Sequence, residues 1–174
     1  DQNDLIEIKK IIKNKKIAIF GKIERSEALQ NLDDIVKHSD GILVARGDLG
    51  VEIGIEQLPA VQDKLINKAM SYDKLVIIAT QMMESMKTNR LPTRAEVFDV
   101  SNAVSSGVDA IMLSGETAVG KYPVDVVLEA SRICEIAEST NRKNITIARK
   151  EKNFSKVDQV IAMAAAYSAD KASI

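Results

Sequence analysis

A chain of 174 residues with a net charge of −1 and only 3% aromatic residues lacks the basic surface and the stacking platforms that nucleic-acid binding requires. Hydrophobic residues make up 45% and charged residues 28%, which is typical of a globular protein and excludes a disordered one. One cysteine, Cys134, excludes an internal disulfide framework, and no apolar run approaches the length of a membrane span. These properties favour a soluble, cytoplasmic α/β protein.

The two ends of the chain predict a fragment. The chain begins at Asp1, without a methionine, inside a segment where Leu5, Ile8 and Ile11 follow helical spacing. It ends at Ile174, where a strand is about to begin. We therefore expect a piece of a longer protein.

Four short apolar runs, at 17–20, 42–45, 75–79 and 110–113, predict four strands. Helical patterns separate them, which predicts a parallel sheet. The runs are almost continuously apolar, so we expect strands that are covered on both faces.

Helices are predicted in each interval. Residues 26–37 carry one apolar stripe, and Pro59 precedes another. Thr93 and Glu96 form a capping box before a third stripe, and Pro123 suits the first position of a fourth helix.

Strand–helix repetition on this scale predicts an α/β fold, namely half of a (β/α)8 barrel, in residues 1–139. The competing fold is an open doubly wound sheet, but the chain has neither a Gly-x-Gly-x-x-Gly turn nor a Walker phosphate loop. The polar segment 140–153 is interpreted as a linker. Residues 154–174 are interpreted as the start of another domain.

Polar side chains follow each run at the edge where barrel active sites form. Residues two apart in a strand face the same way, so each of three pairs should point together: Lys22 with Glu24, Arg46 with Asp48, and Ser114 with Glu116.

Glu24 and Asp48 follow successive strands, and their carboxylates could converge on one cation. Oxygen ligands without nearby His or Cys suit Mg²⁺ or Mn²⁺. Lys22 would add positive charge for a phosphoryl group, and the amides of Gly47 and Asp48 could hold a carboxylate. Thr80 adds a hydroxyl. Taken alone, Lys22 and Glu24 also fit a solvated salt bridge.

Three other features are interpreted as structural. The methionines that follow Thr80 are typical of core filling, and Cys134 lies beside an apolar stripe as a packed thiol. His38 ends a helix near the opposite rim and receives no catalytic role.

Four motifs together resemble the pyruvate kinase family. They are Gly21-Lys22-Ile23-Glu24, the segment 44–52 around Ala45-Arg46-Gly47-Asp48, the segment 79–86 that begins Ala-Thr-Gln-Met, and the segment 112–118 around Ser114-Gly115-Glu116. The resemblance covers essentially the whole chain. It implies strands five to eight of the family's barrel, without the N-terminal half, the lid domain and most of the C-terminal domain.

The resemblance also implies roles and partners. Lys22 would stabilise the phosphoryl group in flight, and Glu24 and Asp48 would bind Mg²⁺ or Mn²⁺. The loop from Ala45 to Asp48 would hold the substrate carboxylate, Thr80 would assist protonation of the enolate, and Ser114 and Glu116 would belong to a proton relay. The implied reaction transfers phosphate from phosphoenolpyruvate to ADP in glycolysis. The implied K⁺ site lies in the absent half, and the parent would be a homotetramer.

The family usually has Ala or Ser before this lysine, whereas Gly21 stands here and should loosen the strand. Two alternatives stay open. One is another Mg²⁺-dependent enzyme acting on pyruvate enolates, such as an aldolase. The other is a non-catalytic half-barrel that self-associates through exposed strand edges.

Overall fold

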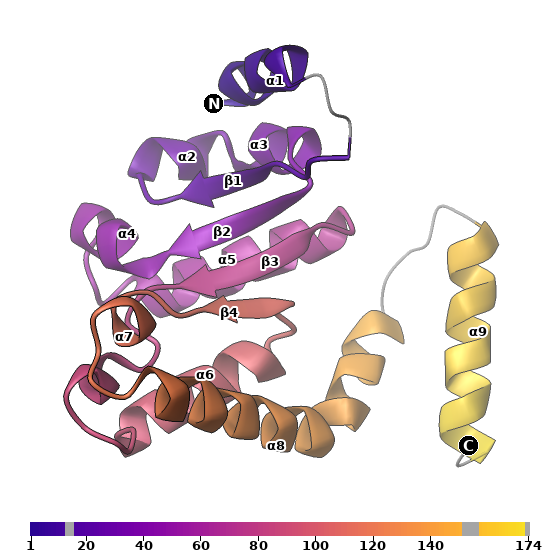
Figure 1. Cartoon of the computed structure of the whole chain (residues 1–174). Helices are drawn as coiled ribbons and strands as arrows, with labels where there is room; N and C mark the ends of the chain where they lie inside the picture. Colours follow the sequence, from indigo (N-terminus) through magenta and orange to yellow (C-terminus); the bar gives the residue numbers. More distant parts are fainter. Residues whose placement is uncertain (13–15, 151–156, 173–174) are drawn as a thin grey trace.

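The computed structural model describes residues 1–12, 16–150 and 157–172. Four strands form one parallel sheet in the order β1-β2-β3-β4 (Figure 1). The strands are β1 (Phe20–Ile23), β2 (Gly41–Ala45), β3 (Leu75–Ala79) and β4 (Ala110–Met112). The expected α/β architecture with a parallel sheet is therefore confirmed.

The first strand was placed too early. Residues 17–20 were expected to form it, but pairing with β2 begins at Phe20, opposite Gly41. Before that point, Ile19 and Asp40 hold the two chains together, because the Ile19 amide donates to the Asp40 carboxylate and the Asp40 amide donates to the Ile19 carbonyl. As a result, Lys22 lies within β1.

The sheet is accompanied by nine α-helices and one 3-10 helix in the described part of the chain. They are α1 (Gln2–Ile11), α2 (Ser26–Gln30), α3 (Leu32–His38), α4 (Arg46–Ile53), α5 (Leu58–Ser71), η1 (Glu84–Lys87), α6 (Arg94–Ser105), α7 (Gly115–Ala118), α8 (Pro123–Lys150) and α9 (Val157–Ala172).

Capping residues explain where several helices begin. The Thr93 side chain accepts from the Glu96 amide while Glu96 reaches back to Thr93, so the predicted capping box is present. Helix α8 begins at Pro123, as expected. The single helix expected over 26–37 is wrong, because Asn31 leaves the helical conformation and divides the segment into α2 and α3.

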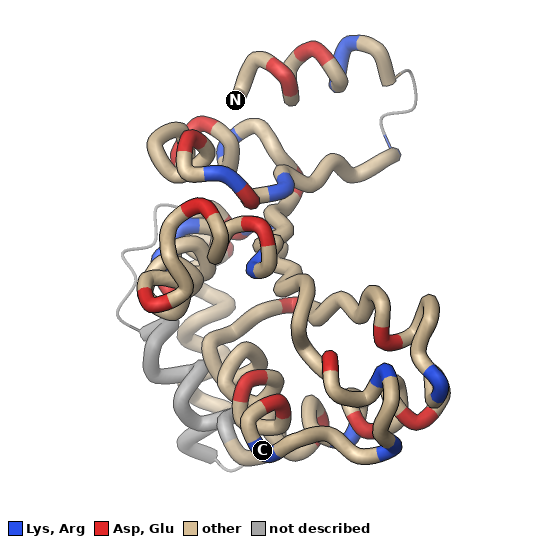
Figure 2. The backbone as a smooth tube through the Cα atoms, turned by 90° about the vertical axis from the view of Figure 1, so that its left-hand side faces the viewer, with Lys and Arg blue, Asp and Glu red and all other residues tan. Residues whose placement is uncertain are grey.

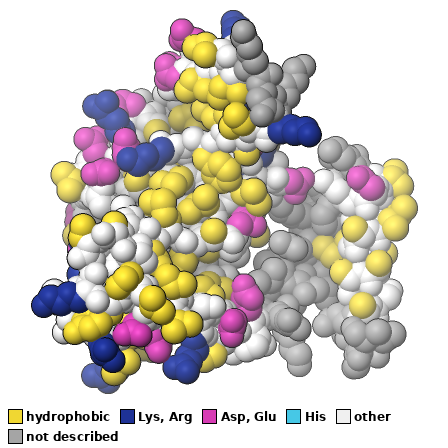
Figure 3. All heavy atoms as spheres, in the orientation of Figure 1, with side chains coloured by type: hydrophobic (Ala, Val, Ile, Leu, Met, Phe, Trp, Pro, Cys, Tyr) yellow, Lys and Arg dark blue, Asp and Glu magenta, His cyan; other side chains and the backbone are white. Residues whose placement is uncertain are grey.

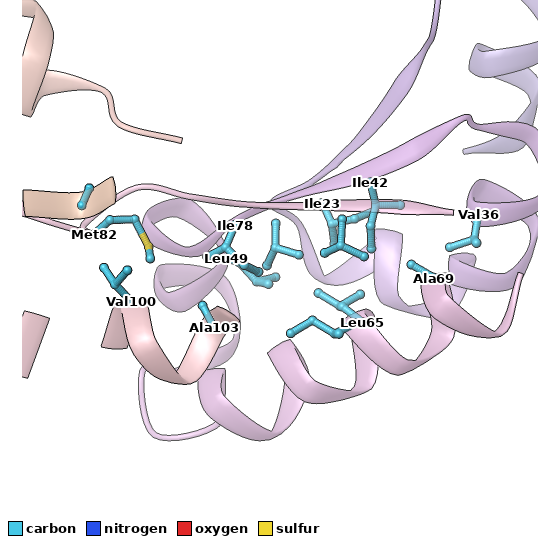
Figure 4. Packing of buried hydrophobic residues seen from close by; sticks show 14 of the residues in the cluster. Ile23, Val36, Ile42, Leu49, Leu65, Ala69, Ile78, Met82, Val100 and Ala103 are labelled. Atoms are coloured by element: carbon cyan, nitrogen blue, oxygen red, sulfur yellow. The ribbon is translucent and has the colours of Figure 1, made fainter. Parts of the chain in front are cut away.

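The core lies between the sheet and the helices on one of its faces. Ile23, Ile42 and Ile78 project from the strands toward helical residues such as Leu65 and Val100 (Figure 4). Gly21 is buried on this face, and a Cβ built there would approach Ile35 Cγ2 to 2.8 Å. Its lack of a side chain therefore permits close packing of β1 on α3.

The opposite face of the sheet is open. Lys22 is exposed there, Leu43 and Ile77 are half-buried, and Leu75 and Met112 are 49% and 36% exposed. Figure 3 shows hydrophobic side chains over the strands on this face. The expectation that both faces would be covered is wrong in the described structure, because the helices cover only one face.

A strand order that follows the chain order explains this asymmetry. When each crossover is right-handed and the order never reverses, the connecting helices all fall on one face. A doubly wound sheet reverses its order and has helices on both faces. The arrangement is therefore consistent with part of a barrel.

The C-terminal part of the chain is helical where it is described. Residues 140–150 continue α8, so a linker over 140–153 stays a prediction, and 151–156 lie outside the described residues. Cys134 is half-buried against the core, and burial, followed by the charge of Glu138, raises the pKa of its thiol. None of the described helices has the length and apolar character needed to cross a bilayer.

Candidate functional site

Strand register brings the exits of the strands to one edge of the sheet. Ile23 pairs with Val44, and Ala45 pairs with Ala79, which in turn pairs with Met112. The segments that leave the four strands therefore begin side by side. Figure 2 turns this edge toward the viewer, and acidic and basic residues lie close together around it.

The first cluster joins β1 to the start of α4. The Lys22 ammonium forms an ion pair with the Glu24 carboxylate and lies 4.0 Å from the Asp48 carboxylate. Lys22 and Glu24 share a side of the chain, as the strand pattern predicted. The two carboxylates therefore meet around one positive charge.

The ion pair sets the charges of this cluster. The hydrogen bond from Lys22 lowers the pKa of the Glu24 carboxyl, against a smaller opposing effect of desolvation. The same contact raises the pKa of Lys22, with a further contribution from the charge of Asp48. Both groups are therefore fully ionised near neutral pH. Their side chains are 54% and 33% exposed, so a ligand can reach them.

The donor set suits a hard divalent cation. Glu24 and Asp48 supply oxygen atoms only, and the Lys22 ammonium shows where a positive charge is favourable between them. Within the described ranges, no three His, Cys, Asp or Glu side chains gather to form a complete metal cage. A Mg²⁺ ion here would therefore take its remaining ligands from water and substrate, as Mg²⁺ commonly does.

Arg46 and Asp48 do not point together, so that expectation is wrong. Helix α4 begins at Arg46, directly after β2, and the two-residue repeat of a strand no longer applies. Arg46 is only 7% exposed and contacts Asp99 of α6, whereas Asp48 is exposed beside Lys22. Ala45, the last residue of β2, is fully buried.

Thr80 lies against the loop after β2. Its Oγ1 accepts a hydrogen bond of 2.8 Å from the Gly47 amide. Thr80 and Gln81 have φ angles of 71° and 56°, which are left-handed conformations. The turn after β3 thus places the Thr80 hydroxyl beside the backbone of the predicted carboxylate loop.

Ser114 and Glu116 lie after β4, but not as strand neighbours, because β4 ends at Met112 and Glu116 belongs to α7. The Glu116 carboxylate is 1% exposed and accepts from the Ser114 amide at 2.7 Å and from the Met83 amide at 3.3 Å. This buried acid therefore ties the loop after β4 to the loop after β3.

Asp99 is the residue that the sequence analysis missed. It lies in α6 and its Oδ1 is 2.7 Å from Arg46 Nη1. The available signal was indirect: an arginine that directly follows a buried strand requires a partner for its charge, but nothing in the sequence identified which acid supplies it.

Comparison with known proteins gives one family. The model of the pyruvate kinase barrel domain matches residues 1–127. The chain is 49% identical over 173 residues to a pyruvate kinase of Buchnera aphidicola from Acyrthosiphon pisum, covering 97% of this chain and 36% of that protein. It is 51% identical over 155 residues to pyruvate kinase II of Salmonella typhimurium, covering 87% and 32% respectively. The chain thus spans about a third of the length of these relatives.

Proposed function

The chain belongs to the pyruvate kinase family, and on that premise we propose that it supplies strands five to eight of the catalytic barrel of a glycolytic phosphotransferase. The reaction transfers the phosphoryl group of phosphoenolpyruvate to the terminal phosphate oxygen of ADP. The enolate that remains takes a proton at its methylene carbon and becomes pyruvate. The observation that carries this proposal is the Lys22 ammonium between the carboxylates of Glu24 and Asp48.

Lys22 has the charge and exposure that this transfer needs. A transferring phosphoryl group carries negative charge on its peripheral oxygens, and catalysis consists mainly of positioning and of offsetting that charge. Lys22 stays protonated because Glu24 raises its pKa. Bound between Glu24 and Asp48, Mg²⁺ or Mn²⁺ would supply further positive charge next to the same group. The K⁺ that the family uses would bind outside this chain.

The loop after β2 is proposed to bind the substrate carboxylate. Gly47 and Asp48 lie in the first turn of α4, where amides point out of the helix and attract anions. The Gly47 amide donates to Thr80 Oγ1, so Thr80 lies where it can contact a molecule bound at this loop and assist protonation of the enolate. Ser114 and Glu116 are proposed to belong to the proton relay of the same cleft.

Activity measurements with a matched lysine pair test the proposal. The chain is assayed for pyruvate formation from phosphoenolpyruvate and ADP with Mg²⁺ and K⁺, alone and mixed with the N-terminal part of the Salmonella relative. We expect activity only in the mixture, and we expect Lys22→Ala to lower kcat at least about 100-fold, because it removes a charge from the transition state.

Lys68→Ala is the control, since Lys68 also pairs with an acid, Asp33 at 3.0 Å, but lies on α5 away from the strand exits. Equal loss in both variants would contradict a catalytic role for Lys22. Aldol cleavage of a pyruvate adduct without phosphoryl transfer would instead favour an aldolase, although the relatives reported above favour the kinase reaction.

The open sheet face favours a second candidate for the chain alone, namely a self-associating half-barrel without activity. Apolar side chains line that face, and β1 and β4 have no second strand partner within the described residues. Unpaired strand edges and exposed apolar surface both promote association.

A further inference from the structure

The Arg46 guanidinium is buried and its contacts all lie within the protein. Nη1 donates to Asp99 Oδ1 at 2.7 Å, and Nη2 lies 3.0 Å from the Thr80 carbonyl oxygen and 3.2 Å from the Gln81 carbonyl oxygen. Nη2 also lies 2.8 Å from the sulfur of Met82, and Nε donates to the Thr80 carbonyl at 3.4 Å. One side chain thus contacts three consecutive residues of the loop after β3.

The turn that Arg46 contacts has an unfavourable backbone. Thr80 and Gln81 have φ angles of 71° and 56°, and a β-branched residue such as Thr80 rarely adopts a left-handed conformation. Such conformations persist only where surrounding contacts hold them. Here the carbonyls of both residues accept from the same guanidinium, which stabilises the turn directly.

Asp99 determines whether Arg46 can stay there. A buried guanidinium requires an opposite charge, and Asp99 supplies it from α6, a helix that otherwise packs its apolar stripe into the core. The Asp99 side chain is 35% exposed and does not lie in the Lys22 cluster. Its effect on the loop after β3 therefore passes through Arg46.

We infer that Arg46 and Asp99 are positioning residues, which hold the Thr80–Gln81 turn and thereby fix the Thr80 hydroxyl against the Gly47 amide. The inference rests on the proposed function only in the step that gives Thr80 a contact with substrate. It assigns Arg46 a different task from carboxylate binding, because a direct contact with substrate would require the guanidinium to leave Asp99 and both carbonyls.

The first test is structural and needs no activity. Amide hydrogen exchange at Gly47, measured by NMR on the full chain, reports the hydrogen bond to Thr80 Oγ1. We expect Asp99→Asn to raise the Gly47 exchange rate about tenfold and Asp99→Glu to raise it less, because glutamate retains the charge. Asp125→Asn is the matched control, since Asp125 also pairs with an arginine, Arg90 at 3.9 Å, but on α8.

The variant Thr80→Val separates positioning from general loosening. It removes the acceptor of the Gly47 amide, so adding Asp99→Asn to it should change Gly47 exchange little. An unchanged rate in Asp99→Asn alone, or an equal increase in the presence and absence of Thr80→Val, would overturn the inference.

Kinetics on the complemented enzyme give the second test. Asp99→Asn should lower kcat roughly 10- to 100-fold while KM for phosphoenolpyruvate stays within about twofold, because it displaces a group without removing a substrate contact. A rise in KM at constant kcat would contradict positioning through Thr80. If the complemented wild type has no activity, the proposed function fails, while the exchange result still decides the inference.

Discussion

Glu96 shows how one carboxylate fixes two segments at the residue scale. Its oxygens accept from the Ser85 amide at 2.7 Å and from the Thr93 amide at 2.7 Å, and both hydroxyls donate as well. Desolvation by burial acts to raise the pKa of Glu96, but the hydrogen bonds from Ser85 and Thr93 together lower it below the ordinary 4.5. The carboxylate therefore clamps η1 to the beginning of α6.

A lowered pKa has a defined consequence for stability. The folded state favours the ionised carboxylate, so the contribution of Glu96 is present above pH 4.5 and is lost as pH falls through the folded-state pKa. We expect Glu96→Gln to lower the free energy of unfolding by about 1 kcal/mol at neutral pH. The difference from wild type should shrink in acid.

Urea unfolding at neutral and acidic pH measures this. Glu135→Gln, at an exposed position of α8, serves as the control and should show a smaller loss at neutral pH. A Glu96→Gln deficit that persists unchanged at the lowest pH would contradict the role of the ionised carboxylate.

The sequence predicted the residues of the Lys22 cluster better than those around Arg46. Lys22 and Glu24 lie at the end of a strand, where the two-residue repeat holds, and they do meet. Arg46 begins a helix, so the same repeat failed, and its partner Asp99 lies 53 positions later in the chain. Contacts at such separations depend on packing, which a local pattern does not contain.

At the scale of elements, long periodic segments were predictable and short ones were not. The stripes of α5 and α6 and the four apolar runs gave their elements correctly, because burial imposes a strong period. Helix α4 was missed, since its sequence, with two internal glycines, has little helical preference and it forms because it follows β2. Helix α7 spans only four residues and carries no period.

Gly41 is a place where strand packing excludes any side chain. A Cβ there would lie 2.7 Å from the Leu75 carbonyl oxygen and would overlap the ring of Phe20. The carbonyl belongs to β3 and cannot move without disturbing the ladder with β2. We expect Gly41→Ala to lower the free energy of unfolding by about 1–3 kcal/mol, measured by urea denaturation.

Gly50→Ala is the matched control, since its Cβ would make an ordinary contact of 3.6 Å with Leu58 and alanine favours the helix of α4. It should be neutral or stabilising by up to about 1 kcal/mol. A Gly41→Ala protein as stable as wild type would show that the edge of β1 yields easily.

At the scale of the whole molecule, one covered and one open sheet face define the behaviour of the isolated chain. We expect it to sediment as a species larger than its 19.0 kDa mass, with the larger species increasing with concentration. Ile77→Lys, in the middle of the open face, should shift the distribution toward monomer because a lysine there must stay in water. Analytical ultracentrifugation measures both.

Val51→Lys is the control, because Val51 is 87% exposed but lies on α4, away from that face. If both lysine variants dissociate equally, net charge and not the sheet face controls association. A wild-type chain that stays monomeric at high concentration would remove the half-barrel hypothesis.

Helix α6 contacts two loops of the site from a single turn. Glu96 holds Ser85 and Asp99 holds Arg46, while Phe98, between them in the chain, is 76% exposed. A displacement of this helix would therefore move both loops at once. A fluorine label on the ring of Phe98 would thus give a spectroscopic report on the geometry of the strand exits from outside them, with no probe placed where a ligand binds.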